Sequence, residues 1–210
     1  MTAASPPLRP APRGPEDFRP QLPRWIAAII VAAIAIASRA ALLAPTLGVH
    51  QLFIGPTDVG VIRRLIDEPG AAPRITGIAP NFEWNAPDGT TKKLSDLRGK
   101  TVVMNFWATW CAPCREEMPA LQRVAGSNGD VVFLAVDLLE SGERVRGFMD
   151  SLALDRLQPL LDLDGAVTRK YSVLELPQTF FVDPRGVIQH IEHGGVLDDA
   201  AVKRGIEKAR

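Results

Sequence analysis

Long apolar runs alternate with amphipathic segments over the C-terminal part of this chain. Residues 101–107 and 131–136 are continuous apolar runs rich in β-branched side chains, which is typical of buried strands. Residues 115–125 and 143–152 place apolar side chains at helical spacing, which predicts a helix after each strand. Because strands that alternate with helices usually pair in parallel, the pattern predicts an α/β domain.

The end of the chain adds antiparallel strands to this pattern. Residues 179–182 and 187–191 flank the turn Asp183-Pro184-Arg185-Gly186, which predicts an antiparallel hairpin. A last helix is expected over residues 197–209. The predicted fold class is therefore α/β, with a central mixed β-sheet flanked by helices.

The segment before the first long strand is less regular. Residues 80–84 and 90–94 flank Pro87-Asp88-Gly89, a turn signal that predicts an N-terminal β-hairpin. Further upstream, residues 58–67 predict one short helix that ends at Glu68-Pro69-Gly70. We interpret residues 47–77 as a juxtamembrane spacer and residues 78–210 as the folded domain.

The start of the chain has a different composition. Residues 1–24 contain seven prolines and four arginines, and such a segment cannot bury a core, which predicts a disordered cytoplasmic leader. Residues 25–46 are almost entirely apolar apart from Arg39 and reach the roughly 20 residues that a helix needs to cross a bilayer. They predict a single transmembrane helix, and the arginines before it place the C-terminal domain outside the cytoplasm, at the inner membrane of the cell. A signal peptide cleaved after Ala35-Ile36-Ala37 is the alternative, with the same topology.

The chemistry of the chain centres on its only two cysteines, Cys111 and Cys114. They lie between the strand 101–107 and the start of the next helix, where unpaired backbone N–H groups carry partial positive charge and favour a thiolate. Cys111 is therefore the expected attacking sulfur. Cys114 lies about one turn later on the same face, so it can close a small disulfide ring as the resolving sulfur. Pro113 is tolerated between them because the first helical turn has no N–H bond to lose.

Other roles for the cysteine pair fit less well. A zinc site needs two more ligands, and His50, His190 and His193 lack the spacing of a zinc finger. A structural disulfide across so short a loop would remove little entropy from the unfolded chain. Lys and Arg together number 24, as do Asp and Glu, so no net charge favours binding to nucleic acid. We therefore predict a redox dithiol that needs no metal and no cofactor.

These motifs resemble a known family. The strand, the Trp110-Cys111-Ala112-Pro113-Cys114 turn, Pro119, and Leu176-Pro177 before a hairpin together resemble a thioredoxin fold. The finer pattern, Asn105-Phe106-Trp107-Ala108-Thr109 before the turn and Leu94-Ser95-Asp96-Leu97-Arg98-Gly99-Lys100 upstream, resembles the membrane-anchored TlpA/ResA group of thiol–disulfide oxidoreductases. The resemblance runs from about Ile78 to the C-terminus.

The resemblance implies roles for individual residues. Pro177 matches the family's cis-proline beside the dithiol, and Leu176 would offer its backbone to a substrate peptide. Gly194 matches a glycine near that groove, where a side chain would crowd the substrate, and Trp110 and Pro113 would also border it.

The resemblance also bears on acidic groups near the dithiol. Asn105 takes the place of the buried aspartate of cytosolic thioredoxin, so another group, or none, must assist the second cysteine. Glu140 matches an active-site glutamate of the ResA-like proteins and could act in acid–base catalysis or tune the cysteines. We expect Glu116 and Glu117 to form a solvated helix face.

The function implied by the resemblance is the reduction of protein disulfides. The partner would be an apocytochrome c whose haem-attachment cysteines must be thiols, and electrons would come from a membrane dithiol relay of the CcdA/DsbD kind. Two alternatives remain open. The dithiol could instead act as a disulfide oxidase or isomerase, depending on its potential, or the protein could be a redox sensor or a copper carrier, since Cu(I) favours thiolates.

Overall fold

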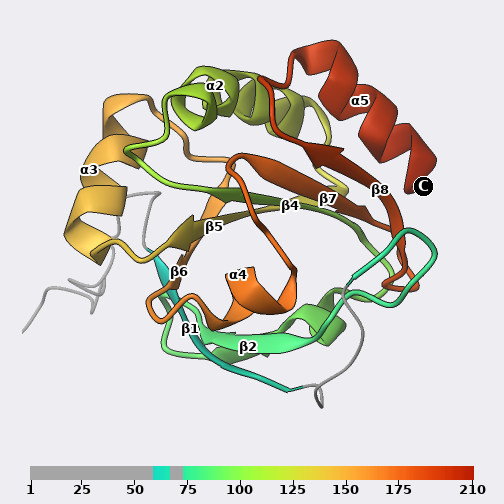
Figure 1. Ribbon diagram of the computed structural model, residues 1–210, viewed down its shortest axis with the longest axis horizontal. Helices are drawn as coiled ribbons and strands as arrows, with labels where there is room; N and C mark the ends of the chain where they lie inside the picture. The colour runs from blue at the N-terminus through green and yellow to red at the C-terminus, as the bar shows by residue number, and fades with distance from the viewer. Residues whose placement is uncertain (1–58, 67–72) are drawn as a thin grey trace, which may run out of the picture. The chain divides into compact units, whose positions relative to one another are not determined.

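The computed structural model describes residues 59–66 and 73–210, and within them eight strands form one sheet (Figure 1). The elements in chain order are β1 (Gly60–Leu65), β2 (Phe82–Asn85), β3 (Thr91–Lys93), the 3₁₀ helix η2 (Leu94–Leu97), β4 (Thr101–Trp107), α2 (Ala112–Ser127), β5 (Val131–Leu138), α3 (Gly142–Ser151), β6 (Gln158–Asp162), α4 (Ala166–Lys170), β7 (Gln178–Val182), β8 (Ile188–His193) and α5 (Asp199–Lys208).

The strand order is β3-β2-β1-β6-β5-β4-β7-β8. The strands β1, β6, β5 and β4 pair in parallel, whereas β7 and β8 continue the sheet beyond β4 in antiparallel fashion. At the other end, β2 pairs antiparallel with β1 and with β3, and Glu83 lies opposite Lys93. The predicted α/β class and central mixed sheet are confirmed.

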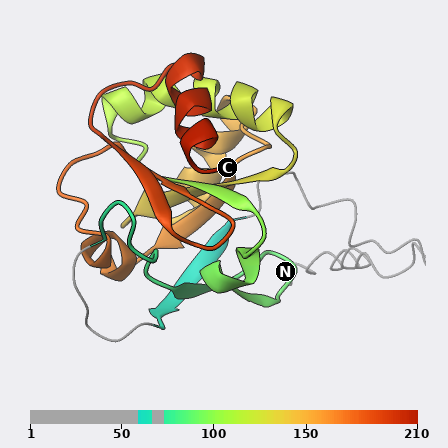
Figure 2. The same cartoon turned by 90° about the vertical axis from the view of Figure 1, so that its right-hand side faces the viewer.

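Strand β4 is buried along its whole length because it has packed layers on both sides. All seven of its residues are buried, and their side chains alternate between two cores. Val103 and Trp107 face the core beneath α2, α3 and α5, while Met104 and Phe106 face the core that includes the aromatic ring of Tyr171. Figures 1 and 2 show α2 and α5 side by side over one face of the sheet, with α4 on the other. This double burial fixes the end of β4, where the cysteine turn begins.

The helix predicted over residues 58–67 is wrong. Residues 60–65 form β1, which is inserted between β2 and β6. A Cβ atom on Gly60 would lie 2.7 Å from Cδ2 of Leu160, so glycine permits the close approach of the two strands. A window this short cannot separate helix from strand by periodicity, and pairing with the sheet decides the outcome. The sheet therefore begins upstream of residue 78, and the spacer interpretation is corrected for residues 60–65.

The predicted membrane anchor at residues 25–46 and the leader at residues 1–24 lie outside the described residues. Within residues 59–66 and 73–210, none of the helices combines the length and the apolarity required to cross a membrane.

Two helical glycines differ in the space available for a side chain. A Cβ atom on Gly205 of α5 would lie 2.3 Å from the ring of Phe181 on β7, whereas one on Gly147 of α3 would meet nothing within 4 Å. We expect Gly205→Ala to lower the free energy of unfolding by roughly 1–3 kcal/mol, because overpacking outweighs the gain in helix propensity. The matched control Gly147→Ala should raise it by about 0.5–1 kcal/mol. Urea unfolding of both variants measures this difference, and equal stabilisation by the two would contradict the packing described.

Candidate active site

The two cysteines form a disulfide at the N-terminus of α2. Their sulfur atoms are bonded at 2.07 Å and their Cα atoms are 5.3 Å apart. Cys111 is the residue that caps the helix, and the backbone N–H of Cys114 donates to its Sγ over 3.3 Å. Cys111 is 5% exposed and Cys114 is fully buried. Cys111 is therefore the sulfur that a partner can reach.

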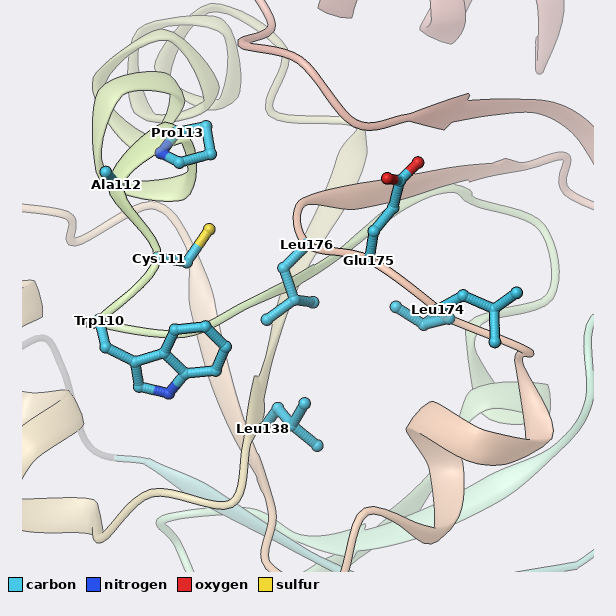
Figure 3. Close-up of a pocket in the computed structure, with 9 residues that line it drawn as sticks. Trp110, Cys111, Ala112, Pro113, Leu138, Leu174, Glu175 and Leu176 are labelled. Atoms are coloured by element: carbon cyan, nitrogen blue, oxygen red, sulfur yellow. The ribbon is translucent and has the colours of Figure 1, made fainter.

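A largely apolar groove opens beside Cys111 (Figure 3). Its volume is about 420 Å³, and it is lined by Trp110, Cys111, Ala112, Pro113, Leu138, Val173, Leu174, Glu175 and Leu176. Trp110 and Leu174 are 65% and 96% exposed, which is unusual for apolar residues of this size. Such exposed apolar surface marks places where another molecule binds.

The loop before β7 forms one wall of this groove. The Leu176–Pro177 peptide bond is cis, and Gly194 N–H donates to the carbonyl of Pro177 over 3.0 Å. Gly194 has a φ of 61°, in the region that favours glycine, and a Cβ there would lie 3.4 Å from a carboxylate oxygen of Glu175. Glycine is therefore demanded by the backbone at this position. The roles of Leu176, Pro177 and Gly194 in substrate binding stay predictions.

Glu140 accepts hydrogen bonds from the loop that precedes the two cysteines. Its two carboxylate oxygens accept from the backbone N–H of Thr109 over 2.5 Å and from the Thr109 hydroxyl over 2.7 Å. Arg144 Nε is 3.7 Å from the same carboxylate. Glu140 therefore fixes the residue two positions before Cys111, while its predicted acid–base role stays a prediction.

Glu117 is an acidic residue whose burial differs from the prediction made from the sequence. The expectation of a solvated face is wrong for Glu117, which is fully buried, although Glu116 is exposed as expected. The carboxylate of Glu117 accepts from Asn105 Nδ2 over 2.7 Å and from the backbone N–H of Leu197 over 3.1 Å. It lies three residues after Cys114, and residues at this spacing share a helix face.

Burial changes the acidity of Glu117. Loss of solvent raises its pKa from 4.5 to about 7, because the hydrogen bonds from Leu197 and Asn105 offset only part of the desolvation. A signal for this burial is present in the sequence, because Cys114, Glu117 and Leu121 follow helical spacing along one stripe. The charge of the Glu117 side chain instead led to the prediction of solvent exposure.

The fold and the site together define a class of protein. A solvent-accessible cysteine caps a helix that follows the central strand of a mixed sheet, a buried partner cysteine follows it, and a cis-proline loop lines the adjacent groove. This is the arrangement of a thioredoxin-like redox dithiol.

Comparison with known proteins agrees with this class. Residues 75–191 match the AhpC/TSA family. The chain is 38% identical over 120 residues to the thioredoxin-like protein YneN of Bacillus subtilis, covering 55% of this chain and 69% of that one. It is 39% identical over 122 residues to the thiol-disulfide oxidoreductase ResA of the same organism, covering 57% and 68%. A thioredoxin family thiol:disulfide interchange protein from Chlorobium tepidum matches in structure with a TM-score of 0.56 and 25% identity, covering 66% of this chain and 99% of that one.

The chain therefore belongs to the AhpC/TSA family, within which it is a thioredoxin-like enzyme. It is a thiol–disulfide oxidoreductase of the ResA type.

The raised pKa of Glu117 predicts a pH-dependent stability. Because folding raises this pKa, the stabilising effect of the bound proton is complete below about 4.5 and is lost as the pH rises to about 7. Replacing Glu117 by Gln should remove that loss, which amounts to roughly 2–3 kcal/mol. Urea unfolding of the oxidised protein between about pH 4.5 and 8 measures the slope. The matched control is Glu116→Gln, which should leave the slope unchanged, and an unchanged slope in Glu117→Gln would contradict the burial of this proton.

Proposed function

We propose that this protein works in the reducing direction and reduces disulfides in partner proteins outside the cytoplasm. The observation that supports this direction is the buried carboxyl of Glu117 near the dithiol. Its hydrogen-bond partners, Asn105 and Leu197, are neutral groups, and no ion pair joins it within the described part of the chain.

The charge of this carboxyl bears on the redox equilibrium. A dithiol protein becomes a strong oxidant when its reduced, thiolate form is stabilised. A carboxylate on the same helix face has the opposite effect, because it repels a thiolate. Glu117 therefore favours electron donation and opposes the oxidase alternative.

The reaction begins with reduced Cys111. Its thiolate attacks one sulfur of the partner disulfide, a mixed disulfide forms, and the other partner sulfur leaves with the electron pair of the broken bond and takes up a proton. The apolar groove beside Trp110 and Leu176 holds the partner chain while the mixed disulfide exists.

The second step releases the partner. Cys114 loses its proton and attacks Cys111, the Cys111–Cys114 disulfide forms, and the second partner sulfur leaves as a thiol. With a pKa of about 7, Glu117 can accept the proton of Cys114 near neutral pH. The partner gains two electrons, and this protein ends in the disulfide form seen in the structure.

The partners follow from the resemblance to the ResA-type enzymes. We infer that the client is an apocytochrome c whose haem-site cysteines must be reduced, and that a membrane dithiol protein of the CcdA/DsbD kind supplies electrons. Residues 25–46 would anchor the enzyme to the inner membrane, and tethering would raise its effective concentration near such a donor.

Replacing Cys114 by Ser tests the client. Without the resolving sulfur, the mixed disulfide on Cys111 should accumulate, and mass spectrometry of the trapped complexes identifies what is attached. We expect c-type apocytochromes. Trapping a broad set of secreted proteins in place of cytochromes would overturn this client, and the control Cys111→Ser should trap nothing.

The reduction potential tests the direction. We expect a value more negative than about −200 mV, within the range of thioredoxins and glutaredoxins. Replacing Glu117 by Gln should make the potential less negative, because a repelling charge is removed. Equilibration with glutathione buffers measures both proteins. A wild-type potential near about −120 mV, the value of a strong oxidant, would support the oxidase alternative.

A further inference from the structure

A second buried acid lies beside Glu140. Asp137, near the end of β5, is fully buried, and Glu140 is 8% exposed. The backbone N–H of Glu140 donates to Asp137 Oδ1 over 3.2 Å, so the two buried acids are direct neighbours. Leu139 between them has a φ of 63°, which is uncommon for leucine, and this turn folds Glu140 back toward the cysteine loop.

Two carboxylates cannot form a hydrogen bond with each other, because an ionised carboxylate only accepts. A hydrogen bond between the carboxyl groups of Asp137 and Glu140 would therefore need one proton on the pair. Without it, two negative charges would face each other away from solvent, which strongly opposes the second ionisation.

The donors around the pair decide which acid keeps the proton. Glu140 accepts hydrogen bonds from the backbone and the hydroxyl of Thr109 and lies near Arg144. Asp137 Oδ2 is buried and has no donor among the described residues. The indole N–H of Trp107, opposite Asp137 in the β4–β5 ladder, is buried without an acceptor in the same part of the chain. Asp137 is therefore the acid that stays neutral.

Among residues 59–66 and 73–210, Asp137 forms no ion pair with a cation. The neighbouring charged and polar groups are Arg144 from α3 and Thr109 from the loop before α2, which both contact Glu140, and Asp162 from the end of β6, whose charge acts on Asp137; Trp107 of β4 is the ladder partner of Asp137. Asp162 adds a further negative charge, and desolvation is the largest cause that raises the pKa of Asp137, to about 8.

We propose that Asp137 and Glu140 form a buried acid pair that shares one proton and positions the Thr109 turn in front of Cys111. Asp137 and Glu140 are positioning residues in this scheme, since neither of them lines the groove. When the pair loses its proton, repulsion between the two carboxylates weakens the hydrogen bonds from Thr109 to Glu140. The added negative charge also destabilises a thiolate at Cys111. The inference rests on the proposed function only because it concerns the reactivity of the same thiol.

Infrared spectroscopy tests the shared proton directly. In a Glu117→Gln background, which removes the other buried acid, we expect the carbonyl stretch of a protonated carboxylic acid at about pH 7 and its loss above about pH 9. Asp137→Asn should abolish this band. Glu140→Gln should keep the band but move its loss to lower pH, because the neighbouring charge is gone. Absence of the band in the background protein would overturn the proposal.

Alkylation of Cys111 tests the positioning role. In a background that carries both Cys114→Ser and Glu117→Gln, which removes the other buried acid, the rate of reaction with iodoacetamide should rise with pH over a range broader than a single titration, because the pair ionises in the same window. Asp137→Asn should narrow this profile to one titration and shift it to lower pH. The matched control Glu143→Gln removes an exposed charge from α3 and should leave the profile unchanged. An identical profile in Asp137→Asn and the background would overturn the positioning role.

Different results would overturn the proposed function and the Asp137–Glu140 acid pair. A wild-type enzyme that does not reduce any protein disulfide would overturn the proposed function and leave the infrared result untouched. A missing band with normal reductase activity would overturn the acid pair alone.

Discussion

The hydrogen bond between Asn105 and Glu117 is the contact on which the arrangement of the active site depends. It joins the central strand β4 to the first turns of α2, and the same two side chains also bond Thr179 on β7 and the backbone of Leu197 before α5. A buried carboxyl must be satisfied by fixed partners, since an unpaired one costs several kcal/mol. One acid therefore ties together the elements that surround the dithiol.

Two opposing electrostatic effects act on the cysteines. The helix N-terminus favours a thiolate at Cys111 by about 0.3–1 kcal/mol, and up to about 2 kcal/mol when partly buried. A carboxylate charge on Glu117 acts most directly on Cys114, three residues earlier, where the 5–6 Å typical of helix neighbours gives a repulsion of a thiolate on the order of 3 kcal/mol at an effective dielectric constant of about 20. At Cys114, an ionised Glu117 therefore outweighs a helix-terminus effect of that size. The balance between the two therefore depends on the protonation of Glu117, whose pKa of about 7 lies in the physiological range.

The parts of this structure that could be predicted from the sequence are those whose side chains are apolar and therefore predict burial. Strand β4 is apolar throughout because both of its faces are covered, and Cys111 and Cys114 are the only cysteines. Strand β1 could not be identified because its six residues carry no decisive period and its pairing partners are distant in sequence. Glu117 and Asp137 were missed for another reason: a charged residue predicts solvent exposure, and only tertiary packing reverses that.

The groove has a consequence for how long a partner can stay bound. Its lining is mostly apolar and its volume of about 420 Å³ accommodates only a few side chains, whereas the contact of a stable protein complex extends over roughly 1,200–2,000 Å². Affinity from such a groove alone is low, and the covalent mixed disulfide must supply most of the attachment during turnover. Resolution by Cys114 then removes that attachment in a single step. A small apolar groove therefore suits a thiol–disulfide oxidoreductase that releases its partner quickly after the exchange.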